Sequence, residues 1–441
     1  MTRPRLDLGV GLVSLSGVDL LWTEIADLVD VLEVEPQTLW QWDRAGGPRL
    51  NPAALRWCKS TGRPLLSHGV GYPVGGTVAP DPRGVQAAAE SARELDAVHW
   101  SEHLSFNQAQ SDRVFHAGFL LPPIPTETAV TAAVSNIARY QDQLDLPFLV
   151  ETPASYLRRT PGDLRDGEFV REVSERADCG ILLDLHNVWA NELNGRQKVL
   201  DFVDELPLER VWELHLAGGM YLDGCYLDAH CGGVAPELLE LAALIVPRLH
   251  NLRAILFEAI PVSLMALGAS GLRRVLTDLH HLADLPEDCA VADPARPAVE
   301  PEPDMPRAEP AAPAPPPSLA PVPVPVPIPI PIPTAQRESL LAAYTTRASD
   351  EIPAADPGAV VLRRLTDDAR LSLVAGADPE RLSWMFARLG RRHTDALMTE
   401  YLAAAPATIW PAAVALDFAR WFDEHRDAWE AASEQNQPIT R

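Results

Sequence analysis

ILLDLHN, at residues 181–187, is an apolar run that ends in Asp184 and His186, and seven other segments of the chain share its form. Each is a short apolar stretch, and nearly all of them end in a histidine or a carboxylate. The other seven are LDLGVG (6–11), VLEVEP (31–36), LLSHGVG (65–71), AVHWSEHL (97–104), FLVETP (148–153), VWELHLAG (211–218) and AILFEAI (254–260). Apolar residues in succession, rather than in strict alternation, indicate strands that are covered on both faces. The sequence therefore predicts eight buried strands with polar residues at their carboxyl ends.

Helical stretches alternate with these strands. Several begin with a capping residue or a proline, as at Asp81-Pro82 and Thr126. The clearest are residues 81–96, 126–144, 167–177, 236–249 and 270–283. Eight βα units predict an α/β fold, a (β/α)8 TIM barrel over residues 1–290, and right-handed crossovers place all strand carboxyl ends on one face. A doubly wound open sheet is the competing arrangement, but no GxGxxG motif follows a strand, and the polar residues end seven strands rather than two.

A proline-rich segment follows the predicted barrel. Residues 294–333 contain 17 prolines in 40 residues and end in an alternation of valine or isoleucine with proline. Because proline fixes φ and lacks an N–H, neither helix nor internal strand can form, and polyproline II is the available state. We predict a disordered linker over residues 291–335. Residues 336–435 carry apolar residues at three- and four-residue spacing, which predicts a small all-α domain.

The composition argues against several classes of partner. The chain has 37 basic and 61 acidic residues, a formal net charge of −24, and no run of Lys or Arg. Nucleic acids and acidic membrane surfaces are bound through clustered cations, so we expect neither as a partner. No run of 18 apolar residues predicts a transmembrane helix, and the N-terminus lacks a signal-peptide core. The five cysteines form no CxxC pair, which indicates reduced thiols and a cytoplasmic location.

The strand ends carry the side chains that bind metal ions. Strand carboxyl ends meet at one mouth of a barrel, so these side chains should converge there. Two further candidates lie in the loop after the seventh strand, and one stands two residues after Asp184, on the same face of an extended strand. A carboxylate is costly to bury without compensation, which metal coordination provides. The predicted ligands are His68, His103, Glu151, Asp184, His186, His215, Asp228, His230 and Glu258.

Nine donors exceed the four to six that one ion takes, so they imply two or three ions that share bridging carboxylates. Imidazoles and carboxylates without thiolate suit iron, manganese or zinc. We predict that Asp184, His186 and Glu258 are also catalytic. Two structural alternatives stand beside this interpretation: a hydrogen-bonded structural role for His68, and an arginine partner for Glu151 or Glu258.

Neighbouring polar residues receive other assignments. Glu102 and His103 are adjacent and face opposite sides of a strand, so only His103 is predicted to line the mouth. His99 lies earlier in the same strand and is predicted to belong to the core. Glu33 and Glu35 end the second strand and are interpreted as substrate- or structure-related.

Two residues are predicted to bind substrate: Glu35, and Asn187 at the start of the loop after the sixth strand. Cys225 and Cys231 flank the loop after the seventh strand. We interpret these two cysteines as bystanders.

These motifs resemble the DUF692 family, the multinuclear non-haem iron-dependent oxidases related to the methanobactin-forming enzyme. The resemblance covers roughly residues 5–285 and rests on ordered motifs at seven strands. The motifs are SHGVG (67–71), SEHLSF (101–106), LLPPIPT (120–126), ETPASYL (151–157), LLDLHNVW (182–189), ELHLAG (213–218) and LDAH (227–230). The resemblance implies a (β/α)8 barrel with two or three iron ions in mixed Fe(II) and Fe(III) states. It also implies that O2 is the cosubstrate.

The resemblance further implies a substrate and a ligand set. Members of the family modify side chains, often cysteines, of ribosomally synthesised precursor peptides, usually together with a separate recognition protein. Eight positions match family ligands: His68, His103, Glu151, Asp184, His215, Asp228, His230 and Glu258. The chain departs from the family where His186 replaces a second Asn, where Gly219 replaces a further His, and where His116-Ala117-Gly118 replaces an Asn-Asp pair. These departures concern the third metal and the exact reaction, not the two-metal core.

The helical domain lies outside the resemblance. We hypothesise that it replaces the separate recognition protein and, tethered by the linker, raises the effective concentration of a captured peptide. An unrelated scaffold or a dimerisation domain is the alternative.

Three other functions compete with the oxidase. A sugar isomerase or epimerase also gathers His, Glu and Asp around divalent ions, but hydride-shift isomerases need a lysine near the mouth and no strand end carries one. A trinuclear-zinc endonuclease uses similar ligands, but the charge of −24 counts against it. A metal-dependent binding module without catalysis is the third.

Overall fold

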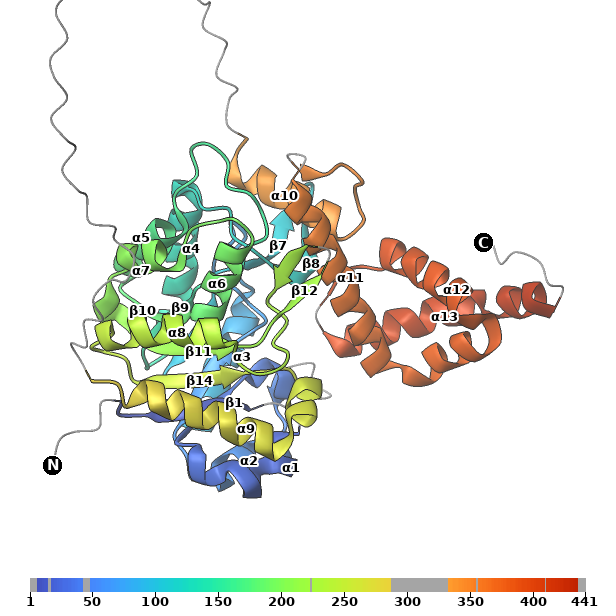
Figure 1. Cartoon of the computed structure of the whole chain (residues 1–441). Coiled ribbons are helices and arrows are strands. Elements are labelled where there is room, and N and C mark those ends of the chain that lie inside the picture. The colour runs from blue at the N-terminus through green and yellow to red at the C-terminus, as the bar shows by residue number, and fades with distance from the viewer. Residues whose placement is uncertain are drawn as a thin grey trace, which may run out of the picture.

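Eight parallel strands form a closed barrel (Figure 1). The computed structural model describes residues 6–14, 17–42, 48–222, 224–286, 332–353, 356–408 and 410–434. Around the barrel the strand order is β1-β14-β11-β10-β9-β6-β5-β2, so the last strand in the sequence pairs with the first. The strands are β1 (Gly9–Ser14), β2 (Val31–Val34), β5 (Leu65–Gly69), β6 (Trp100–His103), β9 (Phe148–Glu151), β10 (Gly180–Asp184), β11 (Val211–Ala217) and β14 (Ala254–Glu258). The predicted TIM barrel is confirmed, and the open-sheet alternative is wrong.

Nine α-helices of the described barrel residues surround these strands. Side chains cap several of them, since Asn51, Asp81 and Thr126 accept hydrogen bonds from backbone N–H groups of the first turn. The helices are α1 (Val18–Ile25), α2 (Pro52–Ser60), α3 (Pro82–Leu95), α4 (Glu127–Gln141), α5 (Asp166–Ala177), α6 (Leu185–Leu193), α7 (Val199–Glu205), α8 (Pro236–Ile245) and α9 (Pro261–Ala283). Short 3-10 turns are η1 (Ala26–Leu28), η2 (Pro36–Leu39), η3 (Leu208–Arg210) and η4 (Val246–Arg248).

Two helices differ from the predicted bounds. The stretch predicted as helical over 236–249 is α-helical only to Ile245, because Pro247 cannot donate to the helical ladder and the chain tightens into η4. The last barrel helix begins at Pro261, nine residues before the predicted start, and is interrupted at Gly268, where φ is 60°.

Three antiparallel hairpins are added to the loops after β2, β6 and β11. They are β3 (Trp40–Trp42) with β4 (Pro48–Leu50), β7 (Phe106–Gln110) with β8 (Val114–Leu121), and β12 (Met220–Leu222) with β13 (Cys225–Leu227). Since loops that follow parallel strands share one face of the barrel, the hairpins extend its mouth. The sequence analysis did not predict them.

The barrel interior is apolar at its amino-terminal end and polar towards the mouth. One buried cluster closes the amino-terminal end with Leu8, Val31, Leu66, Ala254 and Leu256. A much larger apolar cluster fills the space between strands and helices. Among the described residues, the charged side chains of the predicted site therefore lie above an apolar floor, where the strands end.

Four helices follow at the carboxyl-terminal end, and the first two pack directly on the mouth side of the barrel (Figure 1). They are α10 (Thr334–Thr345), α11 (Pro357–Ala377), α12 (Pro379–Ala404) and α13 (Pro411–Glu434). The β7–β8 hairpin buries Phe106 and Leu121 against Leu341, Tyr344 and Leu362 of α10 and α11. The predicted linker over 291–335 lies outside the described residues up to 331, and α10 begins two residues before the predicted domain start at 336.

Polar contacts reinforce this docking at the loops after β5 and β9. The Thr77 backbone N–H donates to both carboxylate oxygens of Glu338, at 3.1 Å each. The Arg337 guanidinium forms an ion pair with Asp163 at 2.6 Å, and the Arg158 backbone N–H donates to Asp356 at 2.6 Å. The hypothesis of a tethered domain did not include such contacts.

The second half of this segment has its own core. Helices α12 and α13, together with the end of α11, bury a cluster that includes Met385, Tyr401, Phe418 and Trp429. Figure 1 shows α12 and α13 extending away from the barrel. The link between the two helices returns to the barrel, where Trp410 stacks on Trp40 with 5.8 Å between ring centroids.

Glu338 provides a test of the docking contact. Burial raises the pKa of Glu338 to about 7, against an ordinary value of 4.5. The folded protein therefore holds this proton more tightly than the unfolded chain. The resulting stability is complete below pH 4.5 and is lost as the pH rises through 7. We expect Glu338→Gln to match the wild type at pH 5 and to be more stable by roughly 1–3 kcal/mol at pH 8. Urea unfolding at both pH values measures the difference, and a pH-independent difference would contradict this assignment.

Candidate metal centre

The first group of ligand-type side chains joins the ends of β5, β6 and β9. Nε2 of His68 lies 3.3 Å, and Nε2 of His103 lies 3.1 Å, from Oε2 of Glu151. The other ring nitrogens are held in place, since Nδ1 of His103 donates to the Gly69 carbonyl at 2.8 Å and Nδ1 of His68 lies 2.8 Å from Oγ of Ser101. A donating Nδ1–H leaves the lone pair of His103 on Nε2, as a metal ligand requires.

The second group shares Glu151 with the first. One ligand atom from each of Glu151, Asp184, His215 and Glu258 lies within 4.8 Å of the others, and all four residues are buried. Nδ1 of His215 is 3.2 Å from Oε2 of Glu258. Oδ1 of Asp184 accepts a hydrogen bond from the Asn187 backbone N–H at the start of α6, so Oδ2 faces the group.

A third group shares Glu258 with the second. Nδ1 of His230 is 3.3 Å from Oε1 of Glu258, and Nε2 of His230 is 2.8 Å from Oδ1 of Asp228. Nε2 of His186 lies 3.6 Å from the same Asp228 oxygen. His230 has a φ of 47°, a left-handed conformation that is uncommon outside glycine and that aims its ring at Glu258. All nine predicted ligand residues thus lie in three groups joined by two carboxylates.

His186 reaches the third group by a route that differs from the prediction. The strand-alternation argument was wrong, because Asp184 is the N-cap of α6 and His186 lies in the first helical turn. The helix directs His186 towards Asp228, with Tyr226 beside its ring. A polar residue at the N-cap position of a helix was the available signal.

Beneath the second group lies a layer of buried polar side chains that sequence reasoning did not assemble. Nε2 of His215 lies 3.2 Å from Oε1 of Glu33 and 3.6 Å from Oε1 of Glu213. Nε2 of His99 is 2.7 Å from the other Glu213 oxygen. All four side chains are fully buried. The only signal in the sequence was a polar residue two positions before a mouth residue, as in Glu213 and His215.

The two predicted substrate-binding residues lie at the centre as well. Glu35 is buried at the start of η2, and burial, with Glu258 as a like charge nearby, raises its pKa to about 7. The Asn187 amide donates to Oε1 of Glu151 at 3.3 Å and to the Thr152 carbonyl. Asn187 therefore orients Glu151, while its own side-chain oxygen is buried without a hydrogen bond.

The residues present fit metal ions. Buried polar groups normally have hydrogen bonds, and an unpaired one is costly. Here at least one buried atom of each group has none. These atoms are Nε2 of His68, Oε2 of Glu151, Oδ2 of Asp184, Nε2 of His215, Oδ1 of Asp228 and Nε2 of His230. Converging imidazole nitrogens and carboxylate oxygens, several of them without a hydrogen bond, match the donor set of iron, manganese or zinc.

The electrostatics of the centre are strongly perturbed. Burial raises the pKa of Asp184 well above its ordinary value, with the negative charges of Asp228 and Glu151 adding to the effect. Burial also acts to raise the pKa of Glu151, but His103 and His68 outweigh it and bring the value to about 2. Carboxyl groups driven in opposite directions within one site are characteristic of functional centres.

Tyr156 connects the third group to a neighbouring loop. Its hydroxyl oxygen accepts a hydrogen bond from the Asp228 backbone N–H at 3.0 Å. Tyr156→Phe should loosen the 228–230 loop and weaken metal binding by the third group about tenfold or more, with the other groups unaffected. Metal content after dialysis against graded chelator measures this, with Tyr221→Phe, an exposed residue of the β12–β13 hairpin, as the control. Equal metal retention by both variants would refute the role of Tyr156.

Comparison with known families agrees with this geometry. The sequence model of the family described as "RiPP precursor modification enzyme MbnB/TglH/ChrH" matches residues 7–259, which span the barrel and the ends of all eight strands. The chain belongs to this family. Membership makes it an enzyme that modifies a precursor peptide.

Curated relatives give the same assignment. A UPF0276 protein of Caulobacter vibrioides is 31% identical over 229 residues, which are 50% of this chain and 80% of the relative. A UPF0276 protein of Acinetobacter baylyi is 31% identical over 216 residues, 48% of this chain and 70% of the relative. These matches cover about half of the chain.

Solved structures with a similar barrel are more distant. A xylose isomerase domain protein of Salmonella typhimurium aligns with a TM-score of 0.44 and 14% identity, over 64% of this chain and 99% of that one. A D-psicose 3-epimerase of Clostridium cellulolyticum aligns with a TM-score of 0.40 and 9% identity, over 62% of this chain and 95% of that one.

Two further observations concern the cysteines and the length of the apolar helices. The four described cysteines, Cys58, Cys179, Cys225 and Cys231, are free thiols. Within the described ranges, none of the helices combines the length and the apolar character that a membrane span requires.

Proposed function

We propose that this enzyme is an O2-dependent oxidase that holds two or three iron ions and modifies a side chain, most suitably a cysteine, of a ribosomally synthesised precursor peptide. The observation that carries the proposal is the convergence of nine imidazole and carboxylate side chains at the mouth of a closed barrel, with buried atoms that lack hydrogen bonds. Family membership supports the peptide substrate, and the donor set supports iron.

Different side chains of the centre are proposed to have different roles. When bound, iron ions would supply the one-electron redox chemistry towards dioxygen that protein side chains lack. Glu151 and Glu258 each belong to two groups, so they would fix the spacing between ions. Asp184, His186 and Glu258 are the proposed catalytic residues. Asp184 and Glu258 belong to the second group, and His186 lies 3.6 Å from Asp228 of the third.

Substrate binding is proposed for Glu35 and Asn187. Both are buried at the centre, and the Asn187 side-chain oxygen is available to accept a hydrogen bond from a peptide N–H. The apolar floor beneath the centre keeps water away from the deeper side, so the peptide reaches the ions only from the mouth.

We further propose that the carboxyl-terminal helices take part in recognition of the peptide in the cytoplasm. The helices contact the loops after β5, β6 and β9, all of which border the mouth. A segment docked at that place would hold a bound peptide close to the metal centre, which raises its effective concentration there.

Metal analysis and peptide modification test the oxidase together. Protein purified without oxygen should contain two or three iron ions per chain. Co-expression with the short cysteine-encoding reading frame nearest its gene, followed by mass spectrometry, should show an oxygen-dependent mass change in the peptide. Zinc as the bound metal would favour an endonuclease, and magnesium or manganese would favour an isomerase. An iron-loaded protein that leaves every neighbouring peptide unchanged would refute the proposed substrate.

A further inference from the structure

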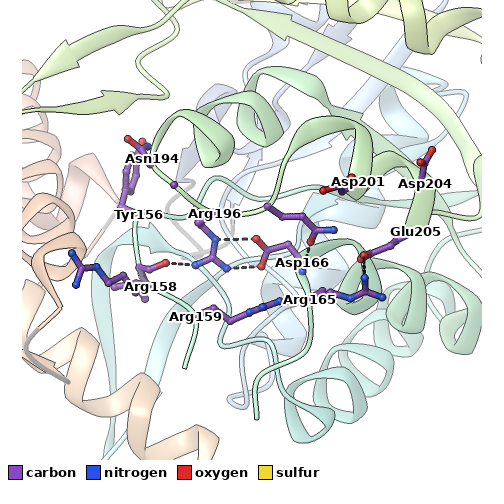
Figure 2. Close-up of a pocket in the computed structure, with 13 residues that line it drawn as sticks. Tyr156, Arg158, Arg159, Arg165, Asp166, Asn194, Arg196, Asp201, Asp204 and Glu205 are labelled. Carbon is purple, nitrogen blue, oxygen red and sulfur yellow. Dashed lines mark hydrogen bonds and ion pairs between the residues drawn. The ribbon is translucent and has the colours of Figure 1, made fainter. Parts of the chain in front are cut away.

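A cavity of about 640 Å³ lies between the loop that follows β9 and the segment from the end of α6 to α7 (Figure 2). Its walls are charged at two ends. Figure 2 shows Arg158 at one end, with Arg159 between it and Arg165, and Asp201, Asp204 and Glu205 at the other end. The two arginines also border a second cavity, of about 950 Å³, on the α10 side of the same loop.

The two arginines differ from the other cations at these cavities. Arg165 forms an ion pair with Glu205 at 2.6 Å, Arg196 binds Asp166 through two nitrogens, and Arg337 binds Asp163. Within the described part of the chain, the side chains of Arg158 and Arg159 have no ion-pair partner. Both are exposed. In a chain with a net charge of −24, these two adjacent arginines give the loop a local positive charge.

The loop that carries them is held in place from both sides. The Arg158 backbone N–H donates to Asp356 before α11, and the Tyr156 carbonyl lies so close to Gly358 that a Cβ there would be 1.9 Å from it. On the barrel side, the Tyr156 hydroxyl accepts from Asp228 of the third ligand group. The arginines therefore stand on a fixed loop that follows Glu151 and contacts the metal centre through Thr152 and Tyr156.

We propose that Arg158 and Arg159 bind carboxylates of an acidic segment of the peptide substrate. The inference rests on the proposed function, and it specifies the chemistry by which that peptide is recognised. Guanidinium groups pair with carboxylates in a defined geometry, and unpaired cations steer an oppositely charged segment towards the mouth. A polyphosphate or nucleic acid fits less well, because Asp201 and Asp204 at the other end of the cavity would repel it.

A binding experiment on metal-free protein separates this inference from the oxidase. The probe is a labelled, end-blocked peptide of alternating glutamate and alanine, compared with its glutamine and lysine counterparts at low ionic strength. We expect the glutamate peptide to bind, and the other two to bind at least about tenfold more weakly. Added salt should reduce the difference, because it screens exposed charges.

Charge reversal makes the test specific to the loop. The double variant Arg158→Glu with Arg159→Glu should bind the glutamate peptide at least about tenfold more weakly than the wild type. It should bind the lysine peptide more tightly. The matched control is Arg56→Glu with Arg83→Glu, two exposed arginines on α2 and α3 with the same change in net charge. The melting temperature reports whether the charge reversal disturbs folding. If it does, the double variant Arg158→Ala with Arg159→Ala is the milder replacement.

Each outcome decides the inference. An equal loss of affinity for the glutamate peptide in the control variant would show that net charge alone attracts the peptide. Unchanged affinity in the loop variants would show that the peptide binds elsewhere. Either result overturns the proposed site. Because no metal is present, neither result bears on whether the loaded enzyme is an oxidase.

Discussion

Glu151→Gln should abolish peptide modification, with activity reduced by more than about 100-fold and the metal content reduced to one ion or fewer. Glu151 is the carboxylate common to the first two groups, with His68 and His103 within 3.3 Å of its Oε2. Glutamine has the same shape, but its amide nitrogen is a donor that faces a cation, so both groups lose their shared ligand.

Glu338→Gln is the matched control for this variant. It makes the same chemical change at another buried carboxylate, which contacts Thr77 rather than the metal centre. The control should keep its full metal content. If Glu151→Gln also keeps its metal as measured by elemental analysis, the assignment of Glu151 as a shared ligand is wrong.

Removal of the metal ions should lower the melting temperature by roughly 10 °C, which is a second large effect. Glu151, Asp184 and Glu258 are buried in one region, and Asp228 beside them is half-buried. The neighbouring histidines offset part of this negative charge, and bound cations would offset the rest. A ligand present at about 1,000 times its Kd adds about 4 kcal/mol to folding stability per site. For a chain of this size, that corresponds to roughly 10 °C.

Asp184→Asn provides the comparison. Asparagine can still accept the hydrogen bond that caps α6, but it removes one negative charge from the second group. Without metal, the variant should have a melting temperature close to that of the metal-free wild type. Added iron should raise the melting temperature of the variant by less, as measured in anaerobic thermal scans. An identical gain in variant and wild type would show that the second group contributes nothing to metal binding.

The barrel could be predicted from the sequence because each of its strands is marked locally. Segments such as FLVETP and AILFEAI combine a continuous apolar run with a terminal carboxylate, and the fold rules for βα units then place those ends together. The three hairpins lack such a signal. Strands of three residues, such as Trp40–Trp42, carry too little periodicity to be distinguished from a loop.

The depth of side chains could be ordered along one strand, as for His99 below His103, but it could not be compared between strands. Glu213 and His215 are two residues apart on one face of β11, yet Glu213 bonds to His99 beneath the centre while His215 reaches Glu258. Which layer each residue occupies depends on the stagger between neighbouring strands, and the register of β10 against β11 shifts between Ile181 and Leu182. That shift is a property of the pairing, which the sequence of either strand does not contain.

The sequence by itself determined that this chain is a barrel with imidazoles and carboxylates at its mouth, because continuous apolar runs and the alternation of strands with helices can be read along the chain. Only the tertiary structure decided that Glu151 and Glu258 join the ligands into one centre, and that α10 and α11 lie against its rim. The apolar faces of those helices could be predicted from the sequence, but an apolar face alone does not identify the surface against which it packs. The Trp40–Trp410 stack and the Thr77–Glu338 contact exist only because residues far apart in the chain meet in space.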